Sequence, residues 1–325
     1  MCRDDRFGGQ PRRCVQRSAC ARTVSVDCIC NHWAVSTIAV THFTDPGCPW
    51  AYSASPAMAV LRWRYGAQLD WRLVTIGLAE DPRRYVDLGY TPTRMTVGNL
   101  SFRRYGMPFL AEPRARVAAT TRACRTIVAT RLLDPPRENE VHRALQLGWF
   151  TTTLVLDQDA DIAKALERVS GLDVEAVLAA IDDERTIAAY EADKRETRTA
   201  EGGPTHFQGK ARQTEGPVRF SAPSLVFKSA DGRRLEAGGF QPVEAYDALI
   251  ANLDPTLERQ APPEEPIEAL RRFPTGLVTQ EVAAIMAHNN QAADRDAAER
   301  ALVELLGAGA VRRLALGDDA LWQIA

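Results

Sequence analysis

The 325-residue sequence predicts an α/β protein with a large helical insertion and a small second module at its C-terminus. Three observations support this fold class. Strand patterns at 36–44 and 69–78 enclose a helical pattern, helical periodicity then runs from about 80 to 209, and a proline-rich stretch at 254–265 precedes a separate pattern at 266–325. Two domains also suit a chain of this length.

The first half of the α/β core is expected to be a strand–helix–strand unit. "STIAVTHFT" (36–44) is apolar and β-branched, as in a buried strand, and "DPGCP" then turns the chain into a helix that ends at Gly66. Pro49 suits the first helical position, while Pro56 should kink the helix. With a second strand at 69–78, this unit predicts parallel pairing and a right-handed crossover.

The second half returns after the helical insertion. "APSLVFK" (222–228) predicts a strand, Asp231-Gly232 a hairpin turn to a second strand, and 242–253 a helix. Within the insertion, Asp173 is placed to cap a helix. Residues 36–253 therefore form one predicted domain, in which a βαβ half and a ββα half flank the insertion at 80–209.

The C-terminal residues 266–325 predict three helices followed by a β-hairpin, the outline of a winged helix, with Thr279 capping the second helix. The stretch from Asp254 to Pro266 contains four prolines and is the predicted linker. The module carries six Arg and no Lys against eight acidic residues. A groove-binding DNA module should be basic, so protein contact, including a homodimer, is favoured over DNA.

The first 35 residues differ from the rest of the chain. They hold five of the seven cysteines, lack helical or strand periodicity, and have none of the organisation of a signal peptide. We interpret 1–35 as a disordered leader or a mis-assigned start, and a zinc site there is only weakly indicated. Because the cysteines are not spread through the fold as a disulfide framework, a reducing, cytoplasmic location is predicted.

Composition excludes several classes of function. A net charge of −2 argues against bulk nucleic-acid binding, and no apolar run approaches the roughly 20 residues that span a bilayer. The sequence contains no metal-ligand spacing of the H-x-x-x-H kind, no P-loop and no GxGxxG, so neither a metal nor a nucleotide is predicted.

"DPGCPWAY" (45–52) carries the candidate site. If Pro49 is the first helical residue, Cys48 is the N-cap, and its sulfur faces the free N–H groups of Trp50 and Ala51. Those donors and the helix dipole favour a thiolate, so the sequence predicts a thiol pKa lowered from about 8.5 toward the 3.5–7.5 range. An inert, buried cysteine is the alternative.

This motif, the helical insertion and "SAPSLVF" resemble the DsbA family of thioredoxin-fold proteins over residues 37–253. Within that family the similarity is to the FrnE-like and 2-hydroxychromene-2-carboxylate isomerase/kappa-class glutathione transferase branches. The resemblance implies that Cys48 and Pro223 are catalytic, with Pro223 in the cis form against the sulfur. It also implies cofactor-binding roles for Pro49, Trp50, Ala51 and Ala222. A plain strand-start proline is the alternative for Pro223.

The chain departs from a dithiol enzyme at Ala51, where a resolving cysteine would stand. Cys124 lies on an apolar helix face and is assigned to the core. Monothiol exchange remains, with a low-molecular-weight thiol or a protein disulfide as partner and no cofactor required in the polypeptide. The alternatives are a thiol-cofactor-dependent isomerase or transferase, in which Cys48 polarises the cofactor sulfur, and a non-catalytic binding protein on the same scaffold.

Weaker indications surround the motif. Trp50 and Tyr52 could wall a pocket or simply pack, Asp45 is expected to order its loop, and His42 is assigned to the core. Residues 80–131 hold ten Arg against four acids, which could attract an anion, although a solvated helix face is favoured. "WFTTTL" (149–154) is a further, weak candidate for a pocket wall.

Overall fold

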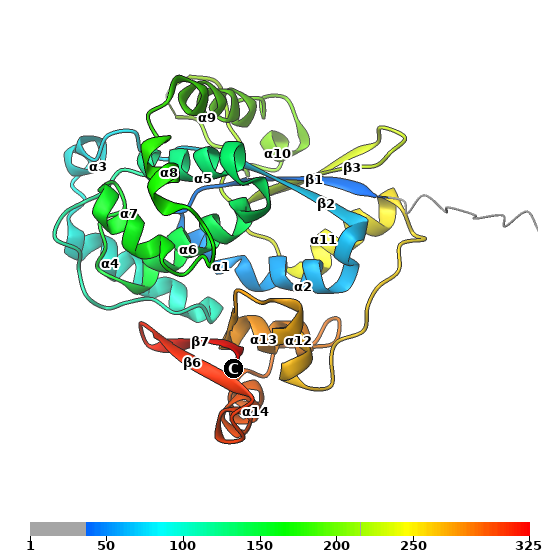
Figure 1. Cartoon of the computed structure of the whole chain (residues 1–325). Coiled ribbons are helices and arrows are strands. Elements are labelled where there is room, and N and C mark those ends of the chain that lie inside the picture. Colours follow the sequence, from blue (N-terminus) through cyan, green and yellow to red (C-terminus); the bar gives the residue numbers. More distant parts are fainter. Residues whose placement is uncertain (1–36, 215) are drawn as a thin grey trace, which may run out of the picture. The chain divides into compact units, whose positions relative to one another are not determined.

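A computed structural model describes residues 37–214 and 216–325 of the chain (Figure 1). The predicted leader, the cysteine cluster and the weak zinc site at 1–35 lie outside the described residues. The fold class is the predicted one: a mixed α/β core with a large helical insertion and a small C-terminal module.

The core sheet has the strand order β2-β1-β3-β4. Strand β1 (Ile38–Thr44) pairs in parallel with β2 (Leu69–Thr75) and antiparallel with β3 (Ser224–Lys228), which in turn pairs with β4 (Arg234–Gly238). Since β1 is central, its carboxyl end places the residues that follow it in the middle of one sheet edge. That edge carries the candidate site.

The helix after β1 is divided in two. Helix α1 (Pro49–Ser53) ends at Ala54, and α2 (Ser55–Tyr65) begins with Pro56 in its first turn. Pro56 has no N–H to continue the hydrogen bonds of α1, which explains the break predicted as a kink. Helices α2 and α11 (Val243–Leu253) cover one face of the sheet, and the core between them includes Ile38, Leu61, Leu225, Phe227, Tyr246 and Ile250.

The insertion is helical, as predicted, and its apolar core continues into Tyr52 of α1, Leu73 of β2 and the C-terminal module. Asp173 caps α8 by accepting the N–H of Ala176 at 3.0 Å, as expected. The helices are α3 (Arg83–Asp87), α4 (Pro92–Leu100), α5 (Thr121–Leu133), α6 (Glu138–Thr151), α7 (Asp159–Leu166), α8 (Val174–Ala179), α9 (Glu184–Thr197) and α10 (Pro204–Phe207). Short 3₁₀ turns lie at Gly66–Gln68, Ser101–Tyr105 and Pro135–Arg137.

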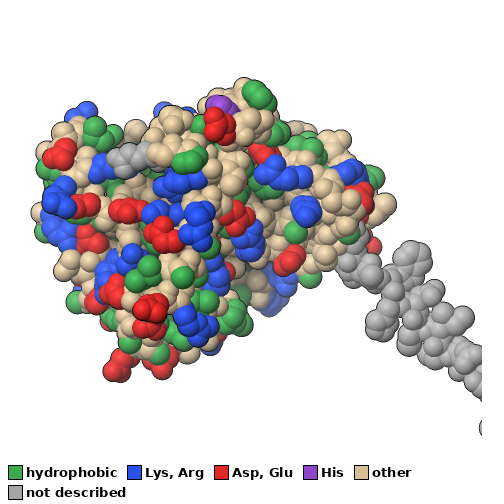
Figure 2. Space-filling view, turned by 90° about the horizontal axis from the view of Figure 1, so that it is seen from above, with side chains coloured by type: hydrophobic (Ala, Val, Ile, Leu, Met, Phe, Trp, Pro, Cys, Tyr) green, Lys and Arg blue, Asp and Glu red, His purple; other side chains and the backbone are tan. Residues whose placement is uncertain are grey.

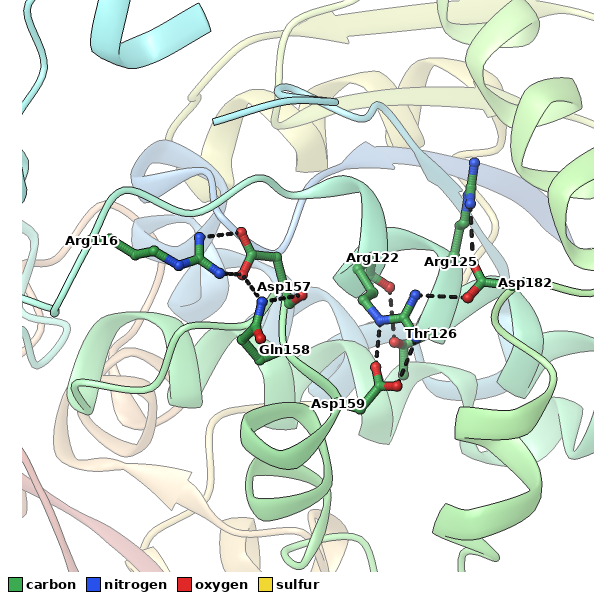
Figure 3. Close-up of polar contacts among 8 residues, drawn as sticks. All are labelled: Arg116, Arg122, Arg125, Thr126, Asp157, Gln158, Asp159 and Asp182. Atoms are coloured by element: carbon green, nitrogen blue, oxygen red, sulfur yellow. Dashed lines mark hydrogen bonds and ion pairs between the residues drawn. The ribbon is translucent and has the colours of Figure 1, made fainter. Parts of the chain in front are cut away.

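Ion pairs join segments of the insertion to one another (Figure 3). Arg122 of α5 lies between Asp159 of α7 and Asp182, with a 2.9 Å contact to the latter, and Arg116 pairs with Asp157. Part of the arginine excess at 80–131 is therefore neutralised by carboxylates that come later in the chain. Such exposed pairs contribute little stability each.

The C-terminal module contains the three predicted helices and the predicted hairpin. These are α12 (Pro266–Arg272), α13 (Thr279–Met286), α14 (Arg295–Gly307), β6 (Val311–Leu316) and β7 (Asp319–Ile324), with β5 (Leu277–Val278) completing a sheet of order β5-β7-β6. The winged-helix classification stays a prediction. The expected cap at Thr279 is wrong: Val278 is the N-cap, and the Thr279 hydroxyl donates instead to Asp319 at 2.7 Å.

Helix α2 also carries the contact with the C-terminal module. Its Trp63 donates its indole N–H to the Ala261 carbonyl at 2.8 Å, and the Gln260 N–H is bonded to the Arg64 carbonyl at 2.8 Å. The proline-rich stretch 254–265 thus runs against α2. The shared apolar cluster includes Ala59, Val60, Trp63, Leu270, Val282 and Trp322. The division into domains stays a prediction, but the two parts share this core.

Candidate functional site

Cys48 lies at the junction of the loop after β1 and the first helix. It is the N-cap residue of α1 in an extended conformation, and Pro49 follows it in the first turn, so the local geometry is the one that the motif suggested. Pro49 is half-buried, whereas Cys48 itself is only 5% exposed.

The loop before Cys48 is held by the buried carboxylate of Asp45. It accepts the N–H of Gly47 at 2.9 Å, the N–H of Leu78 at 2.8 Å and the hydroxyl of Thr120 at 3.1 Å. This is the ordering role expected of Asp45. The carboxylate joins the end of β1, the chain after β2 and the start of α5, and it fixes where Cys48 stands.

Residues far along the chain complete the site. The peptide bond between Ala222 and Pro223 is cis, and the Ala222 carbonyl accepts a hydrogen bond from the Cys48 thiol at 3.3 Å. The loop before β3 thereby meets the start of α1. The cis bond is the one that the resemblance implied, and the group bonded to the sulfur is the Ala222 carbonyl. The catalytic roles of Cys48 and Pro223 stay a prediction.

The predicted lowering of the Cys48 pKa is wrong for this arrangement. Burial raises the pKa of the Cys48 thiol to about 12, because the thiolate would lose its hydration, and the nearby Asp45 carboxylate raises it further. The N–H groups of Ala51 and Trp50 and the Arg219 guanidinium favour the thiolate, but they do not offset burial. Cys48 is therefore a protonated thiol at neutral pH.

A pocket of about 290 Å³ opens beside Cys48. Trp50, which is 39% exposed, forms part of its wall and packs against Phe102 and Phe240 with ring centroids 4.8 and 5.6 Å apart. The lining includes three cationic side chains, those of Lys210, Arg212 and Arg219. A pocket with an apolar wall and this charge fits a small anion that carries a thiol or a disulfide.

No sequence motif marks the three cationic residues as part of the site. They come from the stretch between α10 and β3, where Arg212 and Arg219 pair with each other across a short antiparallel bridge. The sequence feature that could have indicated them is their position within about fifteen residues before Pro223, which was assigned to the site. Which way they face depends on that bridge, and local periodicity does not predict it.

Other predicted residues belong to the core. Ala51 packs in an apolar cluster with Phe43 and Val74, and Tyr52 stacks on Phe150 at 4.7 Å, so neither lines the pocket beside Cys48. His42 is buried, as expected. From "WFTTTL", Trp149 and Phe150 are buried, while Thr152 to Leu154 line a separate cavity between α6, α7 and the C-terminal sheet.

Cys124 is also in the core, as predicted. It is fully buried beside Val128 and Tyr190, and its thiol donates to Asp45 at 3.5 Å. Burial raises its pKa well above the ordinary value. Neither Cys124 nor Cys48 is in a disulfide.

The described part of the chain contains no group of three or more His, Cys, Asp or Glu side chains placed to hold a metal ion. None of the helices at 37–214 and 216–325 is long and apolar enough to cross a membrane. On the face shown in Figure 2, basic and acidic side chains are interspersed.

The sheet order, the cysteine that caps the helix after β1 and the cis proline before β3 define a thioredoxin-like protein. Within this class, the chain belongs to the DSBA-like thioredoxin domain family, whose model matches residues 39–220. No curated protein matches the sequence significantly.

Two solved proteins illustrate the likeness. A proposed protein disulfide isomerase from Nitrosomonas europaea is 18% identical with a TM-score of 0.50, and the match covers 66% of this chain and 97% of that one. The cytosolic disulfide reductase DsbM from Pseudomonas aeruginosa is 18% identical with a TM-score of 0.48, covering 66% and 98%. At this identity the first likeness shows a shared fold.

Proposed function

We propose that this protein is a thiol–disulfide oxidoreductase that uses Cys48 as its single exchanging thiol. The observation that carries the proposal is the meeting of the Cys48 sulfur with the Ala222–Pro223 peptide at the edge of a cationic pocket. Membership of the DSBA-like family supports the general activity. The single-thiol character rests on Ala51 and on the burial of Cys124.

The chemistry would proceed in two exchanges. Cys48 loses its proton, and the thiolate attacks one sulfur of a disulfide; a mixed disulfide with Cys48 forms, and the other sulfur leaves as a thiolate. A second small thiol then attacks the mixed disulfide, which yields a new disulfide and returns Cys48 to the thiolate. Because the resting thiol has a raised pKa, the first exchange should be slow at neutral pH and accelerate as the pH rises.

The pocket favours an anionic partner. Lys210, Arg212 and Arg219 surround the approach to Cys48, and a low-molecular-weight thiol that carries carboxylates would pair with them. A protein disulfide remains the alternative partner. No cofactor in the polypeptide is required for either, and a reducing compartment such as the cytoplasm would keep Cys48 and the external thiol in their reduced forms.

A second candidate function is favoured by the raised pKa. A Cys48 that stays protonated can donate a hydrogen bond but attacks poorly, as expected for a site that binds and polarises the sulfur of a thiol cofactor. In that isomerase- or transferase-like function, Trp50 and Ala222 would contact the cofactor, whereas Pro49 and Ala51, which were also expected to bind it, do not line the pocket. Cys48 would then form no covalent bond.

Mass spectrometry of the Cys48 peptide, with binding of reduced glutathione as a second readout, separates these functions. Wild type, Cys48→Ser and Cys124→Ser are incubated with oxidised glutathione at pH 7 and pH 9. The oxidoreductase predicts a glutathione adduct on the Cys48 peptide that is absent only in Cys48→Ser, forms faster at pH 9, and is removed by reduced glutathione, whatever adducts the five cysteines at 1–35 form.

Arg212→Gln should slow adduct formation with oxidised glutathione more than with the uncharged disulfide of 2-mercaptoethanol. Binding of reduced glutathione without any adduct would favour the cofactor function. A protein that neither binds glutathione nor exchanges with either disulfide would be a binding scaffold, contrary to the proposal.

A further inference from the structure

A third cavity lies on the side of α1 and α2 that faces the helical insertion and the C-terminal module. It measures about 280 Å³, close to the lower end of the roughly 300–1,000 Å³ typical of ligand pockets. The wall is formed by His42 of β1, by α2, by α6 and by residues 272–277 before α13. The linings of this cavity and of the pocket beside Cys48 share no residue.

Arg62 supplies a positive charge in this wall. Its guanidinium lies 4.4 Å from the centre of the Trp71 ring and donates to the side-chain oxygen of Asn139 at 3.1 Å. None of the ion pairs found among residues 37–214 and 216–325 involves Arg62. A half-buried cation with no carboxylate at ion-pair distance is costly to desolvate, and a bound anion would compensate this cost.

His42 supplies an unused polar atom to the same wall. His42 is only 5% exposed, and its Nε2 atom has no hydrogen-bond partner in the described structure. Burial lowers the pKa of His42 well below its ordinary value, so the ring is neutral and can donate a single N–H. Buried polar atoms are nearly always paired, so an unpaired one on a cavity wall indicates a missing partner.

The remaining charges leave the cavity positive. Arg143 donates to both oxygens of Glu281, at 2.7 and 2.6 Å, so these two charges compensate each other. Arg62 and Arg272 then face one further carboxylate, Glu140. Apolar groups complete the lining, among them Met58, Ala59, Phe273, Pro274 and Leu277.

We propose that this cavity binds a small organic anion, with one carboxylate on a compact apolar body. The carboxylate would pair with Arg62 and accept the N–H of His42, and the apolar body would lie against Met58, Phe273 and Leu277. A planar carboxylate matches the fork of N–H donors on a guanidinium. The site is independent of the thiol chemistry at Cys48.

Calorimetric titration with benzoate tests the proposal, and benzamide serves as its uncharged counterpart. Wild type should bind benzoate at least about tenfold more tightly than benzamide, since only benzoate forms a charge-assisted pair. Arg62→Gln should lose this preference. Arg212→Gln, which changes the pocket beside Cys48, should retain it and should affect only the disulfide exchange.

A loss of binding in Arg62→Gln could result from unfolding, so a second variant is chosen that should bind benzoate more tightly. Glu140→Gln deletes the opposing carboxylate and should bind benzoate several-fold more tightly than wild type, at the same far-UV circular dichroism. Equal binding of benzoate and benzamide would overturn the proposal. So would loss of binding in Arg212→Gln with retention in Arg62→Gln, or no binding of benzoate at all, which would make this a water-filled cavity.

Discussion

At the scale of single residues, Asp45 and Arg219 act on Cys48 with opposite sign. The Asp45 carboxylate raises the pKa of the thiol and the Arg219 guanidinium lowers it, while burial outweighs both. The position of Cys48 at a helix N-terminus therefore does not by itself define its reactivity. The two charges around it can be altered separately.

Substitution of these charges should shift the reactivity of Cys48 in opposite directions. Asp45→Asn removes a negative charge, so the thiol pKa falls and alkylation by iodoacetamide at pH 8 accelerates, by on the order of tenfold per pKa unit. Arg219→Gln should slow it. The rates are followed on the Cys48 peptide by mass spectrometry, with Asp81→Asn on the surface as control. Equal alkylation rates in all variants would show that neither charge affects the pKa of the Cys48 thiol.

His142 gives a residue-scale prediction for pH. Burial lowers its pKa to about 3, whereas an unfolded chain would protonate it near 6.5. The unfolded state therefore binds the additional proton between these values, and stability falls as the pH drops through this window.

His142→Gln should remove this contribution, which amounts to about 2 kcal/mol between pH 7 and pH 5 at about 1.4 kcal/mol per pKa unit. Urea unfolding at several pH values measures it. Wild type, unfolded at the same pH values, is the reference. A wild-type slope in His142→Gln would contradict the assignment.

At the scale of elements, the loop between β1 and α1 depends on close packing at Gly47. A Cβ atom there would lie 2.6 Å from the Thr120 methyl group and 3.0 Å from the Trp149 ring. At position 47 there is therefore no room for a side chain between the sheet and the insertion. The position of this loop, and so of Cys48, therefore depends on where α5 and α6 lie.

Gly47→Ala should therefore lower the free energy of unfolding by about 1–3 kcal/mol, as overpacking does. It should also slow the exchange at Cys48, because the loop has to move. Gly98→Ala in α4 is the matched control: its Cβ would meet nothing within 4 Å, and the change should stabilise by about 0.5–1 kcal/mol. Urea titration of both variants decides, and equal effects would refute the close packing.

The strands of the core sheet lie close to the positions that the sequence predicted. The first strand, expected at 36–44, is observed at Ile38–Thr44, and the third, expected at 222–228, begins only at Ser224, after the cis bond. Apolar periodicity is local and predicts these elements well. The burial of Cys48 and the orientation of Lys210 and Arg212 depend on segments that are far apart in the sequence. Local patterns therefore predicted the wrong pKa shift for Cys48 and did not predict that Lys210 and Arg212 line the pocket.

At the scale of the whole molecule, the contact of α2 with the C-terminal module couples the two parts energetically. Trp63 is buried in their shared core, and its indole N–H is bonded to the stretch that joins them. Unfolding either part exposes the apolar face of the other. Residues 37–214 and 216–325 are therefore expected to unfold as one unit.

Calorimetry should show a single transition, and Trp63→Ala should lower the stability of the whole by about 3–5 kcal/mol while leaving the transition single. Val303→Ala, exposed on α14, should change stability by less than about 0.5 kcal/mol. Two separated transitions in wild type would contradict the coupling and support two independent domains.

The hydrogen bond between Cys48 and Ala222 has a consequence for biosynthesis. The two residues are 174 positions apart, so a ribosome adding 5–20 residues per second needs roughly 10–35 s to reach Ala222 after Cys48. Until then, β1 lacks β3 as a neighbour, and the thiol lacks the carbonyl that accepts its hydrogen bond. The nascent chain thus passes through a period in which Cys48 is open to oxidation, and completion of the sheet ends it.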